Sequence, residues 1–473
     1  MKALTRILKS TGFLIFAAAL GGLLTPLSTA RASEAPRPNI IFVLTDDLGY
    51  GDLGCYGQKI VPTPNLDRMA AEGIRFTQAY AGNNCCAPSR CALMTGLHSG
   101  HGTVRNNGGS LNENDVTVAA VLRKAGYATG AFGKWHLGAI GSPGDPLAQG
   151  FDLSYGINPS SGGSETHFST TLYRNGKPEV IEANRNGARG AYGDDLFLAE
   201  ALRFIREHRE KSFFVYLALR APHKALEAPE EDMKQFRGKF QETPFKGDSQ
   251  IGGCPAPRAA RAAMIAHLDR MLPQLFSLLR ELQLERNTLV IFTSDNGPAK
   301  AGGADPEFFG SAGGLRGLKF SMYEGGIRIP MIAWWPGTVP AGVTCDLPCA
   351  FWDFMPTFAE LAGAACPKTD GICILPMLKG DFSGQKPHDY LYWERAGEQA
   401  ARAGQWKGIH TVKTEKLENY DLKADPAERN DVARDKPDVA QRMQAIISEA
   451  HVDNPNYPLG PKPKKAAKRA KQQ

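Results

Sequence analysis

Four apolar runs along the chain predict buried β-strands. They span residues 38–45 (PNIIFVLT), 127–132 (YATGAF), 212–219 (SFFVYLAL) and 287–294 (NTLVIFTS). Each run is continuously apolar, which is typical of a parallel strand covered on both faces, whereas strict alternation is typical of a strand with one face in water. The four runs therefore predict one parallel sheet inside the protein.

Apolar residues at helical spacing fill much of the chain between these runs. Thr63-Pro64 predicts the start of one helix, and Gly126 predicts the end of another. The predicted helices span residues 64–72, 114–125, 194–210, 256–284 and 353–363. Strands that alternate with helices predict an α/β fold, with a large, mainly parallel sheet sandwiched by helices.

The pattern changes after about residue 378. Short aromatic segments follow at 390–394 (YLYWE), 405–412 (QWKGIHTV) and 417–422 (LENYDL), and a helical pattern covers 436–451. We predict a large domain over residues 33–378 and a small C-terminal α+β domain with an antiparallel sheet over 379–460. The lysine-rich end, 461–473, is typical of a solvated, disordered tail.

The N-terminus has the composition of a secretory signal peptide, which we predict over residues 1–32. Three basic residues precede an apolar run at 12–24, and Ala30-Arg31-Ala32 supplies small residues for cleavage before Ser33. An uncleaved anchor is the alternative, but the run is short for the roughly 20 residues that span a bilayer. We therefore expect an exported protein, periplasmic or secreted, without stable membrane insertion.

Composition and charge narrow the class of protein. Hydrophobic residues make up 42% of the chain and charged residues 22%, which is typical of a soluble globular protein. The net charge is +6, but residues 1–32 contribute four positive charges and 462–473 contribute six, so the body between them carries −4. This charge gives no reason to expect a nucleic-acid partner.

Nine cysteines fit an exported protein with disulfide bonds, and the odd number predicts one that does not pair. The short spacings Cys345–Cys349 and Cys366–Cys373 are compatible with local disulfides, and the connectivity stays open. No paired C-x-x-C clusters with histidines occur at zinc-finger spacing, which disfavours a zinc site.

Polar side chains follow the predicted strands at their carboxyl ends. Asp46-Asp47 follows the first run and Asp295-Asn296 follows the last. Such ends meet at one edge of a parallel sheet, and oxygen ligands without histidine or thiolate favour calcium or magnesium. Each pair alone is equally compatible with turn or cap residues. Together they favour one metal site.

One segment resembles the C-x-P-S-R…T-G signature of the sulfatase family: Cys86-Ala87-Pro88-Ser89-Arg90, followed by Thr95-Gly96. This family is similar to arylsulfatases, depends on formylglycine and is part of the alkaline phosphatase superfamily. The resemblance implies that Cys86, and not Cys85, is oxidised to formylglycine before folding. It also implies a partner, a formylglycine-generating or sulfatase-maturating enzyme. A buried or disulfide-bonded cysteine is the alternative for Cys86.

Further motifs continue the resemblance between residues 38 and 426. They are GKWHLG (133–138), SDNG (294–297), RGLK (316–319), EGGIRIP (324–330) and YDL…DP (420–426). Motifs in this order are more specific than any one of them alone. The large domain is then the catalytic sulfatase domain.

The resemblance implies hydrolysis of a sulfate monoester, either an aryl sulfate or a sulfated carbohydrate, with a formylglycine nucleophile and one Ca²⁺ ion. The implied catalytic residues are Cys86, Arg90, Lys134, His136, His223 and Lys319. The implied metal ligands are Asp46, Asp47, Cys86, Asp295 and Asn296. The implied substrate-binding residues are Lys134, Ser160, His223 and Lys319.

The resemblance also implies individual roles. Asp295 acts as the base for the attacking hydroxyl, His223 with Lys319 protonates the leaving group, and His136 takes the proton that releases sulfate. Two alternatives stay open: a phosphodiesterase or phosphonate monoester hydrolase of the same superfamily, and a non-catalytic, calcium-stabilised binding protein. Every reactive position is occupied, which disfavours the second.

Overall fold

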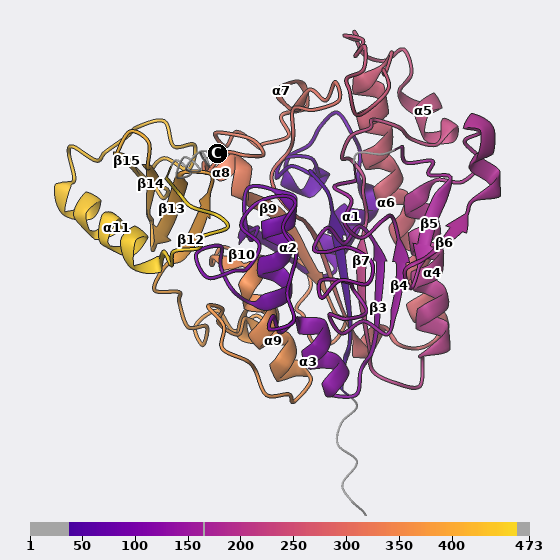
Figure 1. Ribbon diagram of the computed structural model, residues 1–473, viewed down its shortest axis with the longest axis horizontal. Helices are drawn as coiled ribbons and strands as arrows, with labels where there is room; N and C mark the ends of the chain where they lie inside the picture. The colour runs from indigo at the N-terminus through magenta and orange to yellow at the C-terminus, as the bar shows by residue number, and fades with distance from the viewer. Residues whose placement is uncertain (1–36, 164–165, 461–473) are drawn as a thin grey trace, which may run out of the picture. The chain divides into compact units, whose positions relative to one another are not determined.

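The computed structural model describes residues 37–163 and 166–460, so the signal peptide predicted at 1–32 and the tail predicted at 461–473 lie outside the described residues. Its main element is a sheet of eleven strands (Figure 1). These are β1 (Asn39–Thr45), β2 (Ile74–Tyr80), β3 (Ala128–Gly133), β4 (Leu153–Gly156), β5 (Thr171–Arg174), β6 (Lys177–Val180), β7 (Phe213–Ala218), β8 (Thr288–Ser294), β9 (Arg328–Trp334), β10 (Val343–Cys345) and β11 (Cys349–Ala350).

The centre of this sheet consists of β8, β1, β7 and β3, in that order and all parallel. These are the four strands predicted from the apolar runs. Both faces of β1 are covered, since Ile41 and Val43 belong to one buried cluster while Ile40 and Phe42 belong to another. This two-sided burial explains why the runs do not alternate.

The sheet is mixed at its two sides. β9 lies antiparallel between β2 and β8, and β5 is antiparallel to both β4 and β6. β10 and β11 each pair in parallel with β2. The predicted α/β fold with a mainly parallel sheet is therefore confirmed, with antiparallel strands added around the parallel centre.

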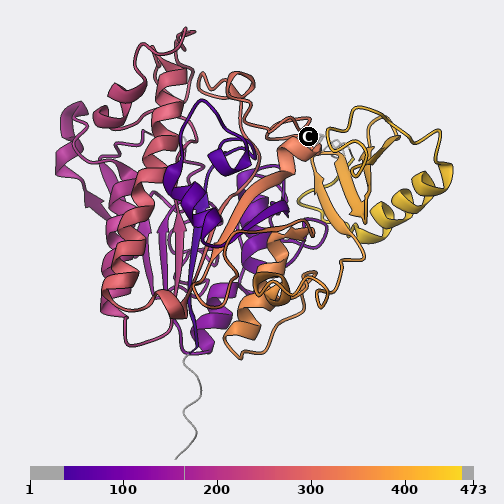
Figure 2. The ribbon, with the colours of Figure 1, turned by 180° about the vertical axis from the view of Figure 1, so that it is seen from behind.

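Helices cover both faces. Residues of α1, α4 and α6 pack in the cluster that contains Ile41, and residues of α2, α3 and α9 pack in the cluster that contains Phe42. Figure 1 shows α2 and α3 in front of the sheet, and Figure 2 shows the long α6 on the opposite side. The helices are α1 (Pro64–Ala71), α2 (Cys86–Thr95), α3 (Val118–Lys124), α4 (Gly193–Glu207), α5 (Glu230–Phe236), α6 (Pro257–Glu281), α7 (Pro306–Phe309), α8 (Glu324–Ile327), α9 (Phe354–Leu361), α10 (Leu375–Leu378) and α11 (Pro437–Ala450).

One helix is shorter than predicted. The pattern over 114–125 predicts a start near residue 114, but α3 begins at Val118. The side chain of Thr117 accepts a hydrogen bond from the backbone N–H of Ala120, so Thr117 is the N-cap. The residues before it form a turn in which Asp115 accepts a hydrogen bond from Asn112.

A second, four-stranded antiparallel sheet follows α10. Three of its strands match the predicted aromatic segments, and α11 matches the predicted C-terminal helix. Met443 and Ile447 of α11 pack against Tyr392 and Ala401 on one face of this sheet. β13 was not predicted because its sequence, EQAARA, contains no aromatic or β-branched residue. The strands are β12 (Leu391–Arg395), β13 (Glu398–Ala403), β14 (Trp406–Thr411) and β15 (Lys416–Asp421).

The predicted disulfides are not formed: all nine cysteines, which lie within the described residues, are free. Cys345 and Cys349 pair with Phe76 and Ala79 of the same strand, β2. Three residues along a strand span about 10 Å, which exceeds the roughly 7 Å between Cα atoms that a disulfide tolerates. The thiol of Cys366 instead lies 3.3 Å from the carbonyl oxygen of Pro367.

A search of the described residues for a helix long and apolar enough to cross a bilayer finds none.

Candidate active site

The carboxyl ends of the four central strands carry one cluster of buried polar side chains. Asp46 and Asp47 follow β1, and the other members follow β3, β7 and β8 in the same way. None of them is more than 6% exposed. The members are Asp46, Asp47, Lys134, His136, His223, Asp295 and Asn296.

Cys86 enters this cluster as the first residue of α2. Pro88 fits the first turn, where a missing backbone N–H costs nothing, and Gly96 ends the helix in the left-handed conformation, with φ of 71°. The hydroxyl of Ser89 accepts a hydrogen bond from the backbone N–H of Gly82. The signature residues thus determine where the helix begins and ends. Cys86 lies at its positive end, where anions are stabilised.

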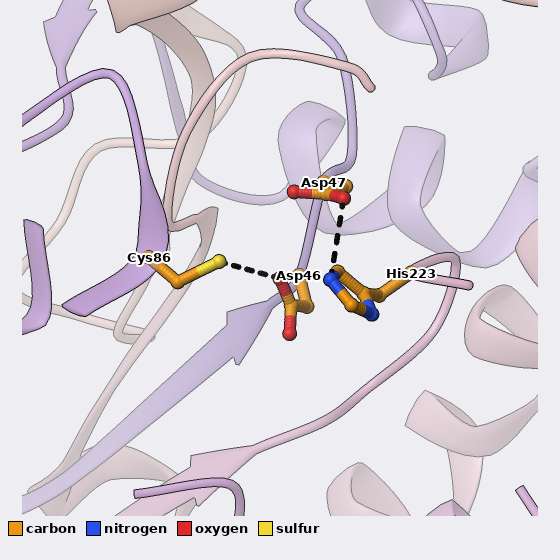
Figure 3. A group of neighbouring side chains, drawn as sticks. All are labelled: Asp46, Asp47, Cys86 and His223. Carbon is orange, nitrogen blue, oxygen red and sulfur yellow. Dashed lines mark hydrogen bonds and ion pairs between the residues drawn. The ribbon is translucent and has the colours of Figure 1, made fainter. Parts of the chain in front are cut away.

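The sulfur of Cys86 lies between a cation and a carboxylate. Lys319 Nζ lies 3.0 Å from Sγ, and the thiol donates a hydrogen bond to Asp46 Oδ1 at 3.4 Å. Figure 3 shows Cys86 and His223 on opposite sides of Asp46. Burial, with the charges of Asp295 and Asp46, raises the pKa of the Cys86 thiol above its ordinary value. Burial lowers the pKa of Lys319, but Asp47 and the other anions raise it further, so the net pKa lies well above the ordinary value.

Asp46 is an acid surrounded by cations. Lys134 Nζ donates to Asp46 Oδ2 at 2.5 Å, and Arg90 Nη2 lies 3.7 Å from the same oxygen. Burial alone raises the pKa of Asp46, but Lys134, His223 and Arg90 lower it, and the net pKa is well below the ordinary value. The carboxylate therefore stays ionised.

Arg90 connects the strand ends. Its Nε and Nη2 both donate to Asp295 Oδ2, at 3.0 and 2.8 Å, and its Nη1 donates to the carbonyl oxygen of Lys134 at 2.7 Å. Burial lowers the pKa of Arg90, but Tyr216 and the carboxylates of Asp295 and Asp46 raise it, so the net pKa lies above the ordinary value. Burial and the charge of Asp46 raise the pKa of Asp295 to about 6, against the effect of Arg90.

Asp47 takes a left-handed backbone conformation, with φ of 65°, which is uncommon outside glycine. Its Oδ1 accepts hydrogen bonds from Lys319 Nζ at 2.6 Å and from Asn296 Nδ2 at 2.7 Å. Asn296 Oδ1 is buried and has no hydrogen-bond partner. A buried amide oxygen without a partner is costly unless a ligand satisfies it.

These residues fit a divalent cation. Four oxygen-bearing side chains (Asp46, Asp47, Asp295 and Asn296) meet here, and hard oxygen ligands suit calcium or magnesium. The unpartnered Asn296 Oδ1 gives the cluster an available ligand atom. Ligand atoms of Asp46, Asp47, Cys86 and His223 also lie within 4.8 Å of one another.

Two histidines lie at the edge of the cluster. His223 Nδ1 lies 2.7 Å from the carbonyl oxygen of Lys224, so we assign the proton to Nδ1, and Nε2 faces Asp47 Oδ2 at 3.7 Å. Burial lowers the pKa of His223 to about 4, although Asp46 raises it. Burial and the nearby Lys134 lower the pKa of His136 to about 2. Both imidazoles are thus neutral near pH 7.

The comparison with known proteins agrees with this geometry. The sulfatase family model matches residues 38–364, more than half of the chain, and a model of the N-sulphoglucosamine sulphohydrolase C-terminal region matches 318–453. The chain belongs to the sulfatase family. Sulfatases cleave esters of sulfuric acid, so this protein is a sulfuric ester hydrolase.

Individual relatives are similar over most of their length. Arylsulfatase A of Homo sapiens is 35% identical, covering 86% of this chain and 80% of the relative. N-acetylgalactosamine-6-sulfatase of Canis lupus familiaris is 33% identical, covering 84% and 77%. A crystal structure of Ps i-CgsB in complex with k-i-k-neocarrahexaose superposes with a TM-score of 0.74 at 30% identity, covering 87% of this chain and 92% of that one.

Ser160 is the one candidate residue of this sulfatase that the structure does not bring into the cluster. It is exposed, and its hydroxyl donates to Asn158 Oδ1 at 3.0 Å. The neighbouring Pro159 does reach the cluster, since its carbonyl oxygen accepts a hydrogen bond from the backbone N–H of His136. The role of Ser160 in substrate binding stays a prediction.

Sequence reasoning missed Arg220 and Tyr216. Arg220 is fully buried, and its guanidinium donates to the carbonyl oxygens of Gly163 and Thr166. A Cβ on Gly163 would lie 3.3 Å from Lys134 Cδ, so Arg220 holds the loop that packs on Lys134. Its position directly after a predicted strand was a usable signal. Tyr216, whose hydroxyl lies 3.4 Å from Arg90 Nη1, lies inside an apolar run and gave no signal.

A second group, formed by His98, His101 and Asp370, also places three possible metal ligands together. His98 Nδ1 accepts the backbone N–H of Gly100 at 3.2 Å, so its proton is on Nε2, which faces Asp370 at 3.7 Å. Such a nitrogen has no lone pair for a cation. Asp370 also accepts the backbone N–H of His98. The group therefore fastens the segment after α2 to the loop around Asp370.

Proposed function

We propose that this sulfatase hydrolyses a sulfate monoester, an aryl sulfate or a sulfated carbohydrate, through a formylglycine made from Cys86 and with one bound Ca²⁺ ion. The observation that carries the proposal is the position of Cys86 Sγ, 3.0 Å from Lys319 Nζ and 3.4 Å from Asp46 Oδ1 at the start of α2. No other cysteine of the described residues lies in such a cluster of cations and carboxylates.

The burial of Cys86 bears on when it is oxidised. Its side chain is 1% exposed, and α2 is buried along its whole length. A modifying enzyme cannot reach it in the folded protein, so the conversion occurs before folding. A formylglycine-generating or sulfatase-maturating enzyme is therefore a partner of the unfolded chain.

The modified residue supplies a nucleophile that the other side chains lack. When the aldehyde is hydrated, one hydroxyl attacks sulfur, and the S–O bond to the alcohol breaks, so the alcohol leaves and the sulfate group is bound to residue 86. Loss of the proton from the other hydroxyl then breaks the C–O bond to sulfate, which releases sulfate and restores the aldehyde. Lys319, Lys134 and Arg90 place fixed positive charge around this position and stabilise the charge that develops on the sulfate oxygens. Asp295 accepts the proton of the attacking hydroxyl.

The two histidines divide the remaining proton transfers. His223 with Lys319 delivers a proton to the leaving oxygen, since both contact Asp47 at the same side of the cluster. His136 accepts the proton whose loss releases sulfate, and its unpartnered, buried Nδ1 is the atom available for it. Lys319, whose pKa is raised, carries a proton for the leaving oxygen, whereas His223 is neutral and must take up a proton before it can act as the acid.

In this proposal the Ca²⁺ ion would be held by five residues: Asp46, Asp47, residue 86, Asp295 and Asn296. Asn296 Oδ1 is the atom whose lack of a partner supports it. When bound, a Ca²⁺ ion would supply positive charge that polarises the sulfate oxygens. We also propose that residues 33–378 form the catalytic domain and 379–460 a C-terminal domain, because α10 ends at Leu378 and β12 starts at Leu391.

Sulfated small molecules and carbohydrates are the proposed substrates, as the names arylsulfatase A and N-acetylgalactosamine-6-sulfatase among the relatives support. For a sulfatase with a predicted signal peptide, we propose a periplasmic or secreted location.

Mass spectrometry of the tryptic peptide 76–90, combined with an assay on 4-nitrophenyl sulfate, tests the proposal. Protein from a host with a formylglycine-generating enzyme should show a loss of about 18 Da at residue 86, the difference between a thiol and an aldehyde side chain. Cys86→Ala should abolish turnover, whereas the matched variant Cys85→Ala should keep both the mass loss and activity within about threefold. An unmodified thiol in an active enzyme would disprove the formylglycine mechanism.

A further inference from the structure

Phe320 is an exposed aromatic residue next to the reacting centre. It directly follows Lys319, and its side chain is 49% exposed, which is rare for an aromatic side chain in this protein. Its φ is 74°, a left-handed conformation that a bulky residue adopts only under constraint. The backbone N–H of Phe320 donates to the carbonyl oxygen of Asn84 at 2.8 Å. The chain therefore holds this ring in the solvent beside the nucleophile.

Arg395, the last residue of β12, faces the same place. Its guanidinium lies 4.7 Å from the centroid of the Phe320 ring, and its Nε donates to Asn106 Oδ1 at 3.1 Å. Burial raises the pKa of the Cys85 thiol, the neighbour of Cys86, to about 11, and the nearby charge of Arg395 opposes this rise. Among the residues that the structure describes, no carboxylate lies within ion-pair distance of Arg395. This guanidinium is thus a half-buried cation near Cys85 that forms no direct ion pair with a described residue, although the charge of Glu398, its neighbour in the β12–β13 pair, acts on it from farther away.

Arg395 lines a polar cavity of about 370 Å³. Phe320 is not part of this lining, but its ring contacts the guanidinium that is. Asn107 connects it to the catalytic helix, because its Oδ1 accepts the backbone N–H of Ala87 at 3.1 Å. Glu394, also in the lining, is neutralised by Arg105 at 2.6 Å. Side-chain amides, a guanidinium and aromatic rings provide the hydrogen bonds and apolar faces that a sugar ring requires. The lining includes Arg105, Asn106, Asn107, Arg395, Asn456 and Tyr457.

We propose that Phe320, Arg395 and this cavity form the subsite for the leaving group, and that the leaving group is a saccharide with a second anionic group. The inference rests on the proposed function. The ring of Phe320 stacks on the apolar face of the sugar, and Arg395 pairs with a carboxylate or a further sulfate of the saccharide. A simple aryl sulfate reaches Lys319 and residue 86 but has no anion for Arg395.

Steady-state kinetics of Phe320→Ala and Arg395→Gln test this assignment. The substrates are 4-nitrophenyl sulfate and three disaccharides with one sulfate ester on the first sugar. The second sugar is neutral, carries a uronic carboxylate or carries a further sulfate. Arg395→Gln should lower kcat/KM for one or both anionic disaccharides about tenfold to a hundredfold, mainly through KM, and change the neutral one by less than about threefold. Whether the carboxylate or the second sulfate loses more identifies the anion.

Phe320→Ala should lower kcat/KM for all three disaccharides about tenfold, and Phe320→Tyr should restore most of it. Val180→Ala and Arg206→Gln are matched controls: Val180 is 50% exposed on the edge strand β6, and Arg206 forms an exposed ion pair with Glu281. Every variant is compared at equal formylglycine content and with its thermal midpoint recorded. If Phe320→Ala does not fold, Phe320→Leu replaces it.

The outcomes separate the two proposals. Two outcomes overturn the subsite and leave the proposed function intact. In the first, Arg395→Gln lowers kcat/KM equally for neutral and anionic disaccharides. In the second, the unsubstituted enzyme hydrolyses 4-nitrophenyl sulfate but none of the disaccharides. Failure of the converted enzyme on all four substrates overturns the proposed function.

Discussion

Asn296 donates a hydrogen bond from Nδ2 to Asp47 Oδ1 at 2.7 Å, and this bond leaves Asn296 Oδ1 buried without a partner. The two residues follow different strands, β8 and β1, so the sheet itself places them together. Asp47 Oδ1 also accepts from Lys319, whose Nζ contacts Cys86. The proposed cation ligands and the proposed nucleophile are thus parts of one buried network, in which a change to one residue affects the others.

Removal of calcium should therefore lower both stability and activity. Dialysis against a chelator should lower the thermal midpoint, and adding Ca²⁺ should restore it, because a ligand at a hundred times its Kd stabilises the folded state by about 2.7 kcal/mol. Asn296→Ala should weaken this response. The exposed Asn114→Ala serves as the control. A midpoint that is the same with chelator and with Ca²⁺ would contradict the proposed metal site.

Lys319→Ala should reduce turnover without preventing the modification of Cys86. Loss of one preorganised donor at a developing anion typically costs about 10²–10³ in kcat. Residue 86 should still show the aldehyde by mass spectrometry, because conversion occurs before Lys319 reaches it. Lys300→Ala, which removes an exposed lysine paired with Glu307, should leave kcat unchanged. Activity of Lys319→Ala within about threefold of the unsubstituted enzyme would remove Lys319 from the catalytic group.

Much of the fold could be predicted because the central strands are covered on both faces. The runs at 38–45 and 287–294 correspond to β1 and β8, and the acids that follow them meet as the parallel arrangement requires. The helix that carries Cys86 could not be found from periodicity. All ten of its residues are buried, so it has no polar face to produce a 3.6-residue pattern. Its chemistry was predicted from the family motif instead.

Residues that act through tertiary contacts were out of reach of sequence reasoning. Phe320 and Arg395 lie 75 positions apart in the chain and meet only because β12 approaches the loop after Lys319. Disulfides were predicted from cysteine spacing, but the register of β10 and β11 on β2 keeps Cys345 and Cys349 apart. In both cases the outcome depends on how separate elements pair in space, and the pattern of residues within one element does not contain this information.

Lys407→Met should destabilise the protein strongly. Lys407 Nζ lies 2.9 Å from a carboxylate oxygen of Glu324 and of Glu428, and all three side chains are fully buried. Without this cation, Glu324 keeps Arg328 at 3.4 Å, but the buried Glu428 loses its cation and faces Glu324. Loss of one partner of a buried pair costs about 3–5 kcal/mol. The control is Lys416→Met, which removes an exposed ion pair with Glu418 in the same small sheet and should cost less than about 1 kcal/mol. Equal midpoints of denaturant unfolding for both variants would refute this role.

The ion pairs of His267 should make stability depend on pH. His267 is 1% exposed, with Nε2 3.0 Å from Asp195 and Nδ1 2.8 Å from Asp232. Burial lowers its pKa, but hydrogen bonds to Asp195 and Asp232 raise it to about 9 in the folded protein, against about 6.5 in the unfolded chain. Its contribution is therefore fully present below pH 6.5 and is lost as pH rises through 9.

The rise of the His267 pKa from about 6.5 to about 9 corresponds to about 3–4 kcal/mol at most. His267→Gln can satisfy only part of these hydrogen bonds, so its thermal midpoint should lie well below that of the unsubstituted protein at pH 6, and the gap should shrink between pH 7 and pH 9.5. His208→Gln is the control, because His208 is half-buried and bonds only to the carbonyl oxygen of Phe204. The thermal midpoint of His208→Gln should stay close to that of the unsubstituted protein at every pH. The ionisation of all other groups is the same in variant and unsubstituted protein, so it cancels in each comparison. A His267→Gln gap that is constant, or that widens toward pH 9.5, would show that His267 is not the charged partner of Asp195 and Asp232.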